Sequence, residues 1–109
     1  MSNLYEETIN YLEHNGYKAA DVDYCSIMID GHNEEIQFDF TEFEENSNFE
    51  YDEFSKDIEV NISLRIVFTD GTWIERWEED GFEAWRHVTP PKKDVNKVRH
   101  GFINLRSPW

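Results

Sequence analysis

The sequence predicts an α+β fold, in which an N-terminal helix packs on a twisted antiparallel sheet of about five strands and a basic C-terminal tail docks on that body. Three observations lead to this prediction. Apolar residues recur with a helical period over residues 4–12. Residues 58–68 alternate apolar and polar side chains, a period that indicates a half-buried strand and excludes a helix. Asp70-Gly71 and Asp80-Gly81 then favour two tight turns, so we expect a three-stranded meander over residues 58–88.

Length and charge define one domain with two parts. A chain of 109 residues can bury one hydrophobic core and is too short for a second. The single domain at 1–109 is therefore expected to consist of an acidic α+β body at 1–89 and a basic tail at 90–109. Residues 1–85 hold 23 of the 24 acidic and four of the ten basic residues, a net charge of −19, whereas residues 86–109 carry +5.

The predicted helix runs from Asn3 to Asn15. Asn3 is a suitable N-cap, and Glu6 follows three residues later, as in a capping box. Gly16 ends the helix because glycine tolerates the left-handed conformation of a C-terminal cap. Its apolar stripe is expected to contain Leu4, Tyr5, Ile9, Tyr11 and Leu12.

Two further strands are expected before the meander. The first covers residues 24–29 and is closed by Asp30-Gly31, and the second alternates apolar and polar residues over 36–41. Cys25 is then expected to point into the core, where a thiol acts as a small hydrophobe rather than a nucleophile.

The register of the meander follows if both turns are two-residue loops. Phe68 then faces Trp73, and Trp77 faces Ala84 across the second turn. One core face is expected to contain Leu64, Ile66, Phe68, Trp73 and Trp77. Because side chains alternate with a period of two, a slip of one residue would reverse this assignment.

The same register predicts two interactions of charged residues. Glu75 faces Arg86, and this ion pair contains the one carboxylate that we expect to be partly buried. On the opposite face Arg76 lies beside Trp85, in position for a cation–π contact. Arg65 would then face Arg76, a like-charge pair that a bulge or a nearby carboxylate must relieve.

Acidic and aromatic residues alternate over residues 42–57, and a second acidic group surrounds the Asp80-Gly81 turn. One interpretation is an acidic loop or short helix whose carboxylates only face water. The other is a surface that binds lysines and arginines of a partner. A calcium loop is disfavoured because the segment has no glycine. The predicted partner-binding residues are Glu42, Glu44, Glu45, Phe49, Glu50, Tyr51, Asp52, Glu53, Glu78, Glu79, Asp80 and Glu83.

The tail changes character at Pro90-Pro91, where regular structure must break. The acidic residues of the body attract the basic residues of the tail, so we expect the tail to lie back on the acidic sheet. Val95, Val98 and Phe102 are expected to share one side of a short helical turn and to hold this docking. Screened surface charges alone contribute too little.

Recognised catalytic and metal-binding motifs are absent from the sequence. It contains no Gly-rich phosphate loop, G-x-S-x-G, H-E-x-x-H or CxxC, and its four histidines are not at ligand spacing. We therefore expect no catalytic residues, no metal and no cofactor. A single cysteine fits a reducing compartment, and no apolar run approaches the roughly twenty residues of a membrane span. The expected location is the cytoplasm of a host bacterium.

The negative charge predicts a basic protein as partner, because such a field repels nucleic acid and anionic membranes. The segment DGTWIERWEEDGFEAWRHVTPP resembles a hairpin of small acidic proteins from phages and mobile elements. In charge, size and lack of motifs the chain also resembles phage-encoded inhibitors of bacterial defence, the DNA-mimicking anti-restriction and anti-CRISPR proteins. The resemblance implies that surface carboxylates replace phosphates in the basic channel of a nuclease.

These observations favour a non-enzymatic acidic inhibitor of a basic nucleic-acid-handling defence protein, such as a CRISPR effector or a restriction nuclease. It would act as a monomer or homodimer and bind neither nucleic acid nor membrane directly. Two alternatives stay open: an immunity protein against a nuclease toxin, and a small phage structural or assembly module whose acidity serves solubility.

Overall fold

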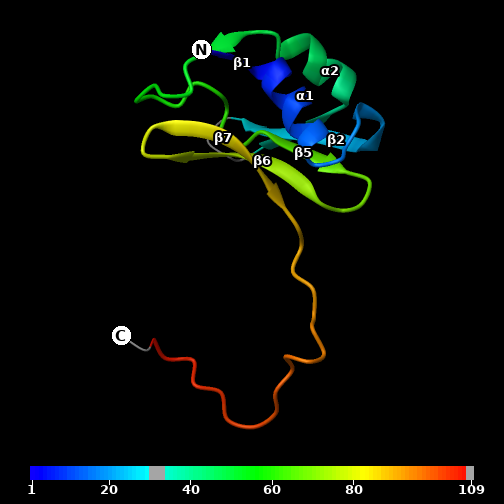
Figure 1. Ribbon diagram of the computed structural model, residues 1–109, viewed down its shortest axis with the longest axis vertical. Helices are drawn as coiled ribbons and strands as arrows, with labels where there is room; N and C mark the ends of the chain where they lie inside the picture. The colour runs from blue at the N-terminus through cyan, green and yellow to red at the C-terminus, as the bar shows by residue number, and fades with distance from the viewer. Residues whose placement is uncertain (30–33, 108–109) are drawn as a thin grey trace.

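The computed structural model describes residues 1–29 and 34–107 and has an α+β fold (Figure 1). Its main sheet is antiparallel, with strand order β3-β2-β5-β6-β7. The strands are β2 (Val22–Ile29), β3 (Glu34–Phe38), β5 (Arg65–Phe68), β6 (Trp73–Glu79) and β7 (Phe82–Val88). The helices α1 (Leu4–His14) and α2 (Phe40–Asn46) cover one face of this sheet, and the short strands β1 (Ser2–Asn3) and β4 (Glu50–Tyr51) pair beside them. The predicted fold class is confirmed, and the Asp30-Gly31 turn lies outside the described residues.

The first helix forms as its sequence predicts. The Asn3 side chain accepts a hydrogen bond from the backbone N–H of Glu6, and Gly16 follows the helix with φ +77°. Its buried residues are Leu4, Thr8 and Leu12, spaced by four. Thr8 was not expected there; its hydroxyl donates to the carbonyl of Leu4 and accepts from the indole of Trp85, so its polar atom is satisfied.

The strand predicted over residues 36–41 begins and ends earlier in the sequence than expected, at Glu34 and Phe38. It ends at Phe38 because the Asp39 side chain accepts a hydrogen bond from the N–H of Glu42 and thereby caps α2. Phe43 of α2 then joins the core, whereas Ile36 on the edge strand is exposed. Part of the acidic segment is therefore a short helix.

The first turn of the meander has three loop residues instead of two. The N–H of Phe68 donates to the carbonyl of Thr72, and Gly71 has φ +87°, as in a hairpin with a bulge. Val67 consequently faces Trp73, so the predicted pairing of Phe68 with Trp73 is wrong by one residue. Arg65 therefore faces Glu75, and the predicted like-charge pair with Arg76 does not form.

This slip reverses the predicted faces of β6. Ile74 and Arg76 are buried under the helices, while Trp73 and Trp77 are half-buried on the opposite face. The core tryptophan is Trp85 instead. The second turn is the predicted two-residue loop, with positive φ at its two residues, and places Trp77 opposite Ala84.

Residues 58–64 do not form the predicted strand. The buried carboxylate of Glu83 accepts hydrogen bonds from the N–H groups of Glu59 and Val60, which a strand would have paired with a neighbour. Asn61 then starts a turn, in which its carbonyl accepts from the N–H of Leu64. Val60 and Leu64 still belong to the core, but Ile58 and Ile62 are exposed, so the predicted alternation fails in this segment.

One hydrophobic core lies between the helices and the sheet. Its buried residues are Leu4, Leu12, Cys25, Phe43, Tyr51, Val60, Leu64, Ile66, Phe68, Ile74 and Trp85. The Cys25 thiol is fully buried as predicted, and burial, aided by the charge of Asp39, raises its pKa to about 12. Across the described residues, no helix combines the length and apolar character that crossing a bilayer requires.

The tail does not dock on the body, which corrects the prediction. Residues 89–107 are exposed, and the chain runs away from the sheet after β7 (Figure 1). The radius of gyration is 17.4 Å, against about 13 Å for a compact domain of this length. Val95 and Phe102, expected to hold the tail, are 76% and 89% exposed, and residues 95–102 contain no helix.

Candidate partner-binding surface

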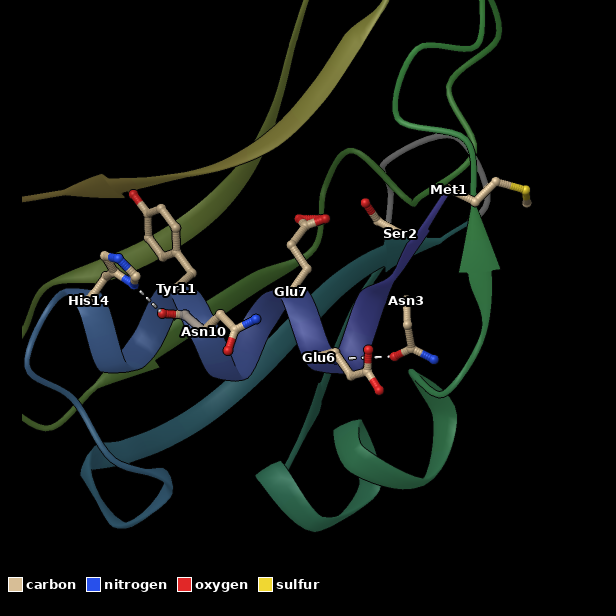
Figure 2. Close-up of a pocket in the computed structure, with 8 residues that line it drawn as sticks. All are labelled: Met1, Ser2, Asn3, Glu6, Glu7, Asn10, Tyr11 and His14. Carbon is tan, nitrogen blue, oxygen red and sulfur yellow. Dashed lines mark hydrogen bonds between the residues drawn. The ribbon is translucent and has the colours of Figure 1, made fainter.

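Three adjoining surface pockets follow the outer side of α1. One, of about 610 Å³, is lined by residues of β1 and α1 that include Glu6, Glu7 and Tyr11 (Figure 2). A second shares Glu6 with it and extends to α2, and a third shares Glu7 and Tyr11 and extends to the loop after β4. Their five accessible carboxylates form what we call the acidic strip: Glu6, Glu7, Glu44, Glu45 and Glu53.

The strip has the chemistry of a cation-binding surface. None of the described residues that line these three pockets is a lysine or an arginine, and three of the five carboxylates, those of Glu6, Glu44 and Glu45, have no ion pair within the described part of the chain. Glu7 pairs with the buried Arg76, and the N-terminal ammonium lies 4.0 Å from Glu53. The other polar lining groups include the side-chain amides of Asn3, Asn10 and Asn48. Hydrogen bonds from its own backbone N–H and from Ser2 lower the pKa of Glu53, so this carboxylate is charged at neutral pH.

Glu7, in the middle of the strip, is held by a buried arginine. Arg76 projects from β6, and its Nη1 donates to Glu7 Oε2 at 2.7 Å, while its Nη2 donates to the Tyr51 hydroxyl at 2.9 Å. Tyr51 also donates to the other oxygen of Glu7. The guanidinium lies 5.0 Å from the ring centroid of Trp85, which confirms the predicted cation–π contact. These contacts fix the Glu7 side chain before any partner arrives.

Tyr51 and Glu83 belong to this buried network, which corrects their assignment to the partner-binding surface. Each is only 2% exposed. Burial, together with the hydrogen bond to Glu7, raises the pKa of Tyr51, so its hydroxyl remains a donor. The Glu83 carboxylate lies 3.9 Å from Arg76 and accepts the two loop N–H groups described above. Neither side chain can meet a partner.

The other predicted residues are accessible. Glu53 is half-buried, and nine are exposed: Glu42, Glu44, Glu45, Phe49, Glu50, Asp52, Glu78, Glu79 and Asp80. The loop after β4 and the β6–β7 turn lie side by side, because the N–H of Glu83 donates to the carbonyl of Glu53 and the rings of Phe54 and Phe82 are 5.2 Å apart. The two predicted acidic regions therefore adjoin at this end of the molecule.

Sequence reasoning missed the contribution of α1. In the sequence, Glu6 was interpreted as part of a capping box, and neither Glu6 nor Glu7 was assigned to a binding surface. In the structure, both connect the acidic residues of α2 with those of the loop after β4. A usable signal was present: Glu6 and Asn10 are four residues apart and opposite the buried stripe, so they share the outer face of the helix.

The predicted ion pair of Glu75 and Arg86 is confirmed, on the face of the sheet away from the helices. Arg86 Nη2 lies 2.6 Å from Glu75 Oε2, and the Trp73 indole donates to Oε1. Burial alone would raise the pKa of Glu75, but hydrogen bonds from Trp73 and Arg86 bring it below its usual value. Glu75 is not the only partly buried carboxylate, since Glu7 and Glu83 are also partly or wholly buried.

A separate polar cluster lies at the end of the sheet from which the tail departs. The hydroxyl of Tyr17 donates to Asp70 at 2.6 Å, and that of Thr72 donates to its other oxygen at 2.7 Å. These bonds lower the pKa of Asp70 to about 2. His87 Nε2 lies 2.9 Å from the Thr72 hydroxyl. Because its lone pairs are occupied by donors, Asp70 is a poor general base.

No group of three histidine, cysteine or acidic side chains within residues 1–29 and 34–107 is arranged to hold a metal ion. Comparison of the chain with protein-family models, with curated proteins and with solved structures gives no match.

Proposed function

We propose that the protein is a non-enzymatic inhibitor that binds a basic nucleic-acid-handling protein of bacterial defence, such as a CRISPR effector or a restriction nuclease, in the cytoplasm of the host. The observation that carries the proposal is the acidic strip, in which five carboxylates line three joined pockets without a lysine or arginine among the described lining residues. The partner's lysines and arginines normally bind the phosphates of nucleic acid. They would bind the carboxylates of the acidic strip through the same attraction between opposite charges.

Preorganisation supports a binding role for the strip. Arg76 and Tyr51 fix Glu7, so this side chain loses little conformational freedom when a cation binds. The carboxylates further along, on α2 and at the β6–β7 turn, extend the negative field and speed association with a basic partner. Occupation of the basic channel by these carboxylates excludes the nucleic acid.

A specific observation favours one alternative, a small phage assembly module. The tail exposes apolar side chains that an assembly interface would cover. Ionic strength separates the two functions, because binding through carboxylates weakens steeply with added salt and binding through apolar residues does not. An immunity protein against a nuclease toxin would also bind through carboxylates, and it differs in leaving the nucleic-acid channel open when it binds away from the active site.

The test has two steps. The tagged protein is used to capture partners from a bacterial lysate at low salt, and bound proteins are eluted at high salt and identified. A purified partner is then titrated with duplex DNA in the presence and absence of the protein. The proposal expects mutually exclusive binding. A partner that binds the protein and DNA together with undiminished affinity would overturn the mimicry and favour an allosteric or assembly role.

A further inference from the structure

The tail exposes apolar side chains to solvent. Over residues 89–107 the exposed apolar residues are Val95, Val98, Phe102, Ile103 and Leu105. Phe102 and Leu105 are 89% and 91% exposed, and basic residues are interspersed among the five. A segment with this alternation has the chemistry of a ligand for a groove with an aromatic floor and an acidic rim.

The body has such a groove, formed by the third pocket beside α1. Its volume is about 320 Å³, and we call it the aromatic groove. Its apolar lining consists of Tyr11, Phe54, Phe82, Ala84 and Trp85, and its accessible carboxylates are Glu7 and Glu53. Phe54 is 71% exposed and Phe82 is 38% exposed, so the groove has uncovered ring surface. Its charge is opposite to that of the tail.

Over residues 89–107 the tail does not occupy the groove of its own chain. The tail leaves the sheet after Val88, which pairs with Trp73, whereas the groove lies beside Phe82 at the other end of β7. Six strand residues separate these ends by about 20 Å. The tail runs away from the body after β7 (Figure 1), and none of its described residues lines the groove.

We infer that the tail of one copy docks into the aromatic groove of a second copy. Phe102 and Leu105 supply the apolar contact, and the neighbouring basic residues meet Glu7 and Glu53. Reciprocal exchange gives a two-fold symmetric dimer with two identical tail–groove interfaces. The groove is one of the three pockets of the acidic strip, so a docked tail and the proposed partner compete for Glu7 and Glu53. The experiment that tests the dimer uses only copies of this chain, so its outcome does not depend on the proposed function.

Sedimentation experiments on the full-length protein over a range of concentrations test the inference with two variants. Phe102→Ala/Leu105→Ala removes the contact from the tail, and Phe54→Ala/Phe82→Ala removes it from the groove. Each is expected to weaken dimerisation at least about ten-fold. The matched control Ile36→Ala/Ile62→Ala also truncates two exposed apolar residues and should dimerise as the wild type does.

Mixing the two variants gives the sharpest result. A tail-deficient chain still has an intact groove, and a groove-deficient chain has an intact tail, so the mixture should form a heterodimer through one complete interface. Circular dichroism checks the fold, and the tail variant suffices if the groove variant does not fold, because its substitutions lie outside the core. A wild type that stays monomeric at every concentration overturns the inference, as do a tail variant that dimerises normally and a mixture of folded variants that stays monomeric.

Discussion

Arg76 on β6 donates a 2.7 Å hydrogen bond to Glu7 on α1, and thereby joins the sheet to the acidic strip. The guanidinium is fully buried, and its contacts with Tyr51 and Trp85 come from two further elements. One side chain therefore connects four elements of the fold, α1, β4, β6 and β7. Its removal would leave the carboxylates of Glu7 and Glu83 without their cation.

Replacing Arg76 by alanine should lower the free energy of unfolding by about 3–5 kcal/mol, the usual effect of removing one partner of a buried ion pair. Arg86→Ala is the matched control, because Arg86 pairs with Glu75 on the neighbouring strand but is 56% exposed, and it should cost about 1 kcal/mol or less. Urea denaturation measures both. Equal losses would contradict the structural role assigned to Arg76.

Trp85→Ala should destabilise the protein by about 3–5 kcal/mol, because the indole is buried and donates to Thr8. Trp77→Ala on the same sheet should cost less than about 2 kcal/mol, because that side chain is half-buried on the other face. Chemical denaturation of both variants provides the comparison. A larger loss of stability for Trp77→Ala than for Trp85→Ala would contradict the observed register and favour the predicted one, in which the first turn also has two residues.

Gly71→Ala should destabilise the fold by about 1–2 kcal/mol through the backbone alone. Gly71 has φ +87°, and a Cβ built there meets no atom within 4 Å, so no steric clash contributes. Gly101→Ala is the control: Gly101 also has positive φ and free space, but it lies in the tail and should leave thermal unfolding unchanged. An unchanged melting temperature for Gly71→Ala would argue against the three-residue turn.

The Asp70 carboxylate should titrate near pH 2 in the folded protein, instead of near its ordinary pKa of 3.8. Its contribution to stability is complete above about pH 4 and is lost as the pH falls through about 2, since the unfolded chain binds the proton first. Tyr17→Phe removes the main donor and should raise the pKa toward its ordinary value. NMR titration of the side-chain carboxyl carbon measures both, and identical midpoints would show that the Tyr17 hydrogen bond does not cause the shift.

The two hairpins explain what the sequence could and could not predict. Asp80-Gly81 forms the two-residue loop that this dipeptide favours, and the pairing of β6 with β7 follows from it. Asp70-Gly71 also fits a three-residue loop with glycine in the left-handed position, and alternation alone does not distinguish the two loops. A single additional loop residue exchanged the faces of β6 and placed Trp85 in the core instead of Trp73 and Trp77.

The sequence indicated which acidic residues belong to the candidate surface, but it did not indicate which of them are buried. The carboxylates of residues 42–57 are visible in the sequence, yet the burial of Glu83 depends on Arg76 and on the loop N–H groups of Glu59 and Val60. The bonds from Glu59 and Val60 join segments 24 and 23 residues apart, and no local pattern indicates them. The docked tail was inferred from opposite charges, with apolar side chains of residues 95–102 expected to hold it, and neither feature defines a site on the body.

The most direct test of the acidic strip compares two variants that each lose four negative charges. Glu6→Gln/Glu44→Gln/Glu45→Gln/Glu53→Gln neutralises the strip and leaves Glu7 to hold Arg76. Glu13→Gln/Asp23→Asn/Glu34→Gln/Glu35→Gln neutralises four exposed carboxylates elsewhere. Calorimetric titration of a basic partner captured at low salt should show a loss of affinity of at least about ten-fold for the strip variant, a smaller loss at high salt, and a much smaller loss for the control. Equal affinities of the two variants at low salt would contradict the account.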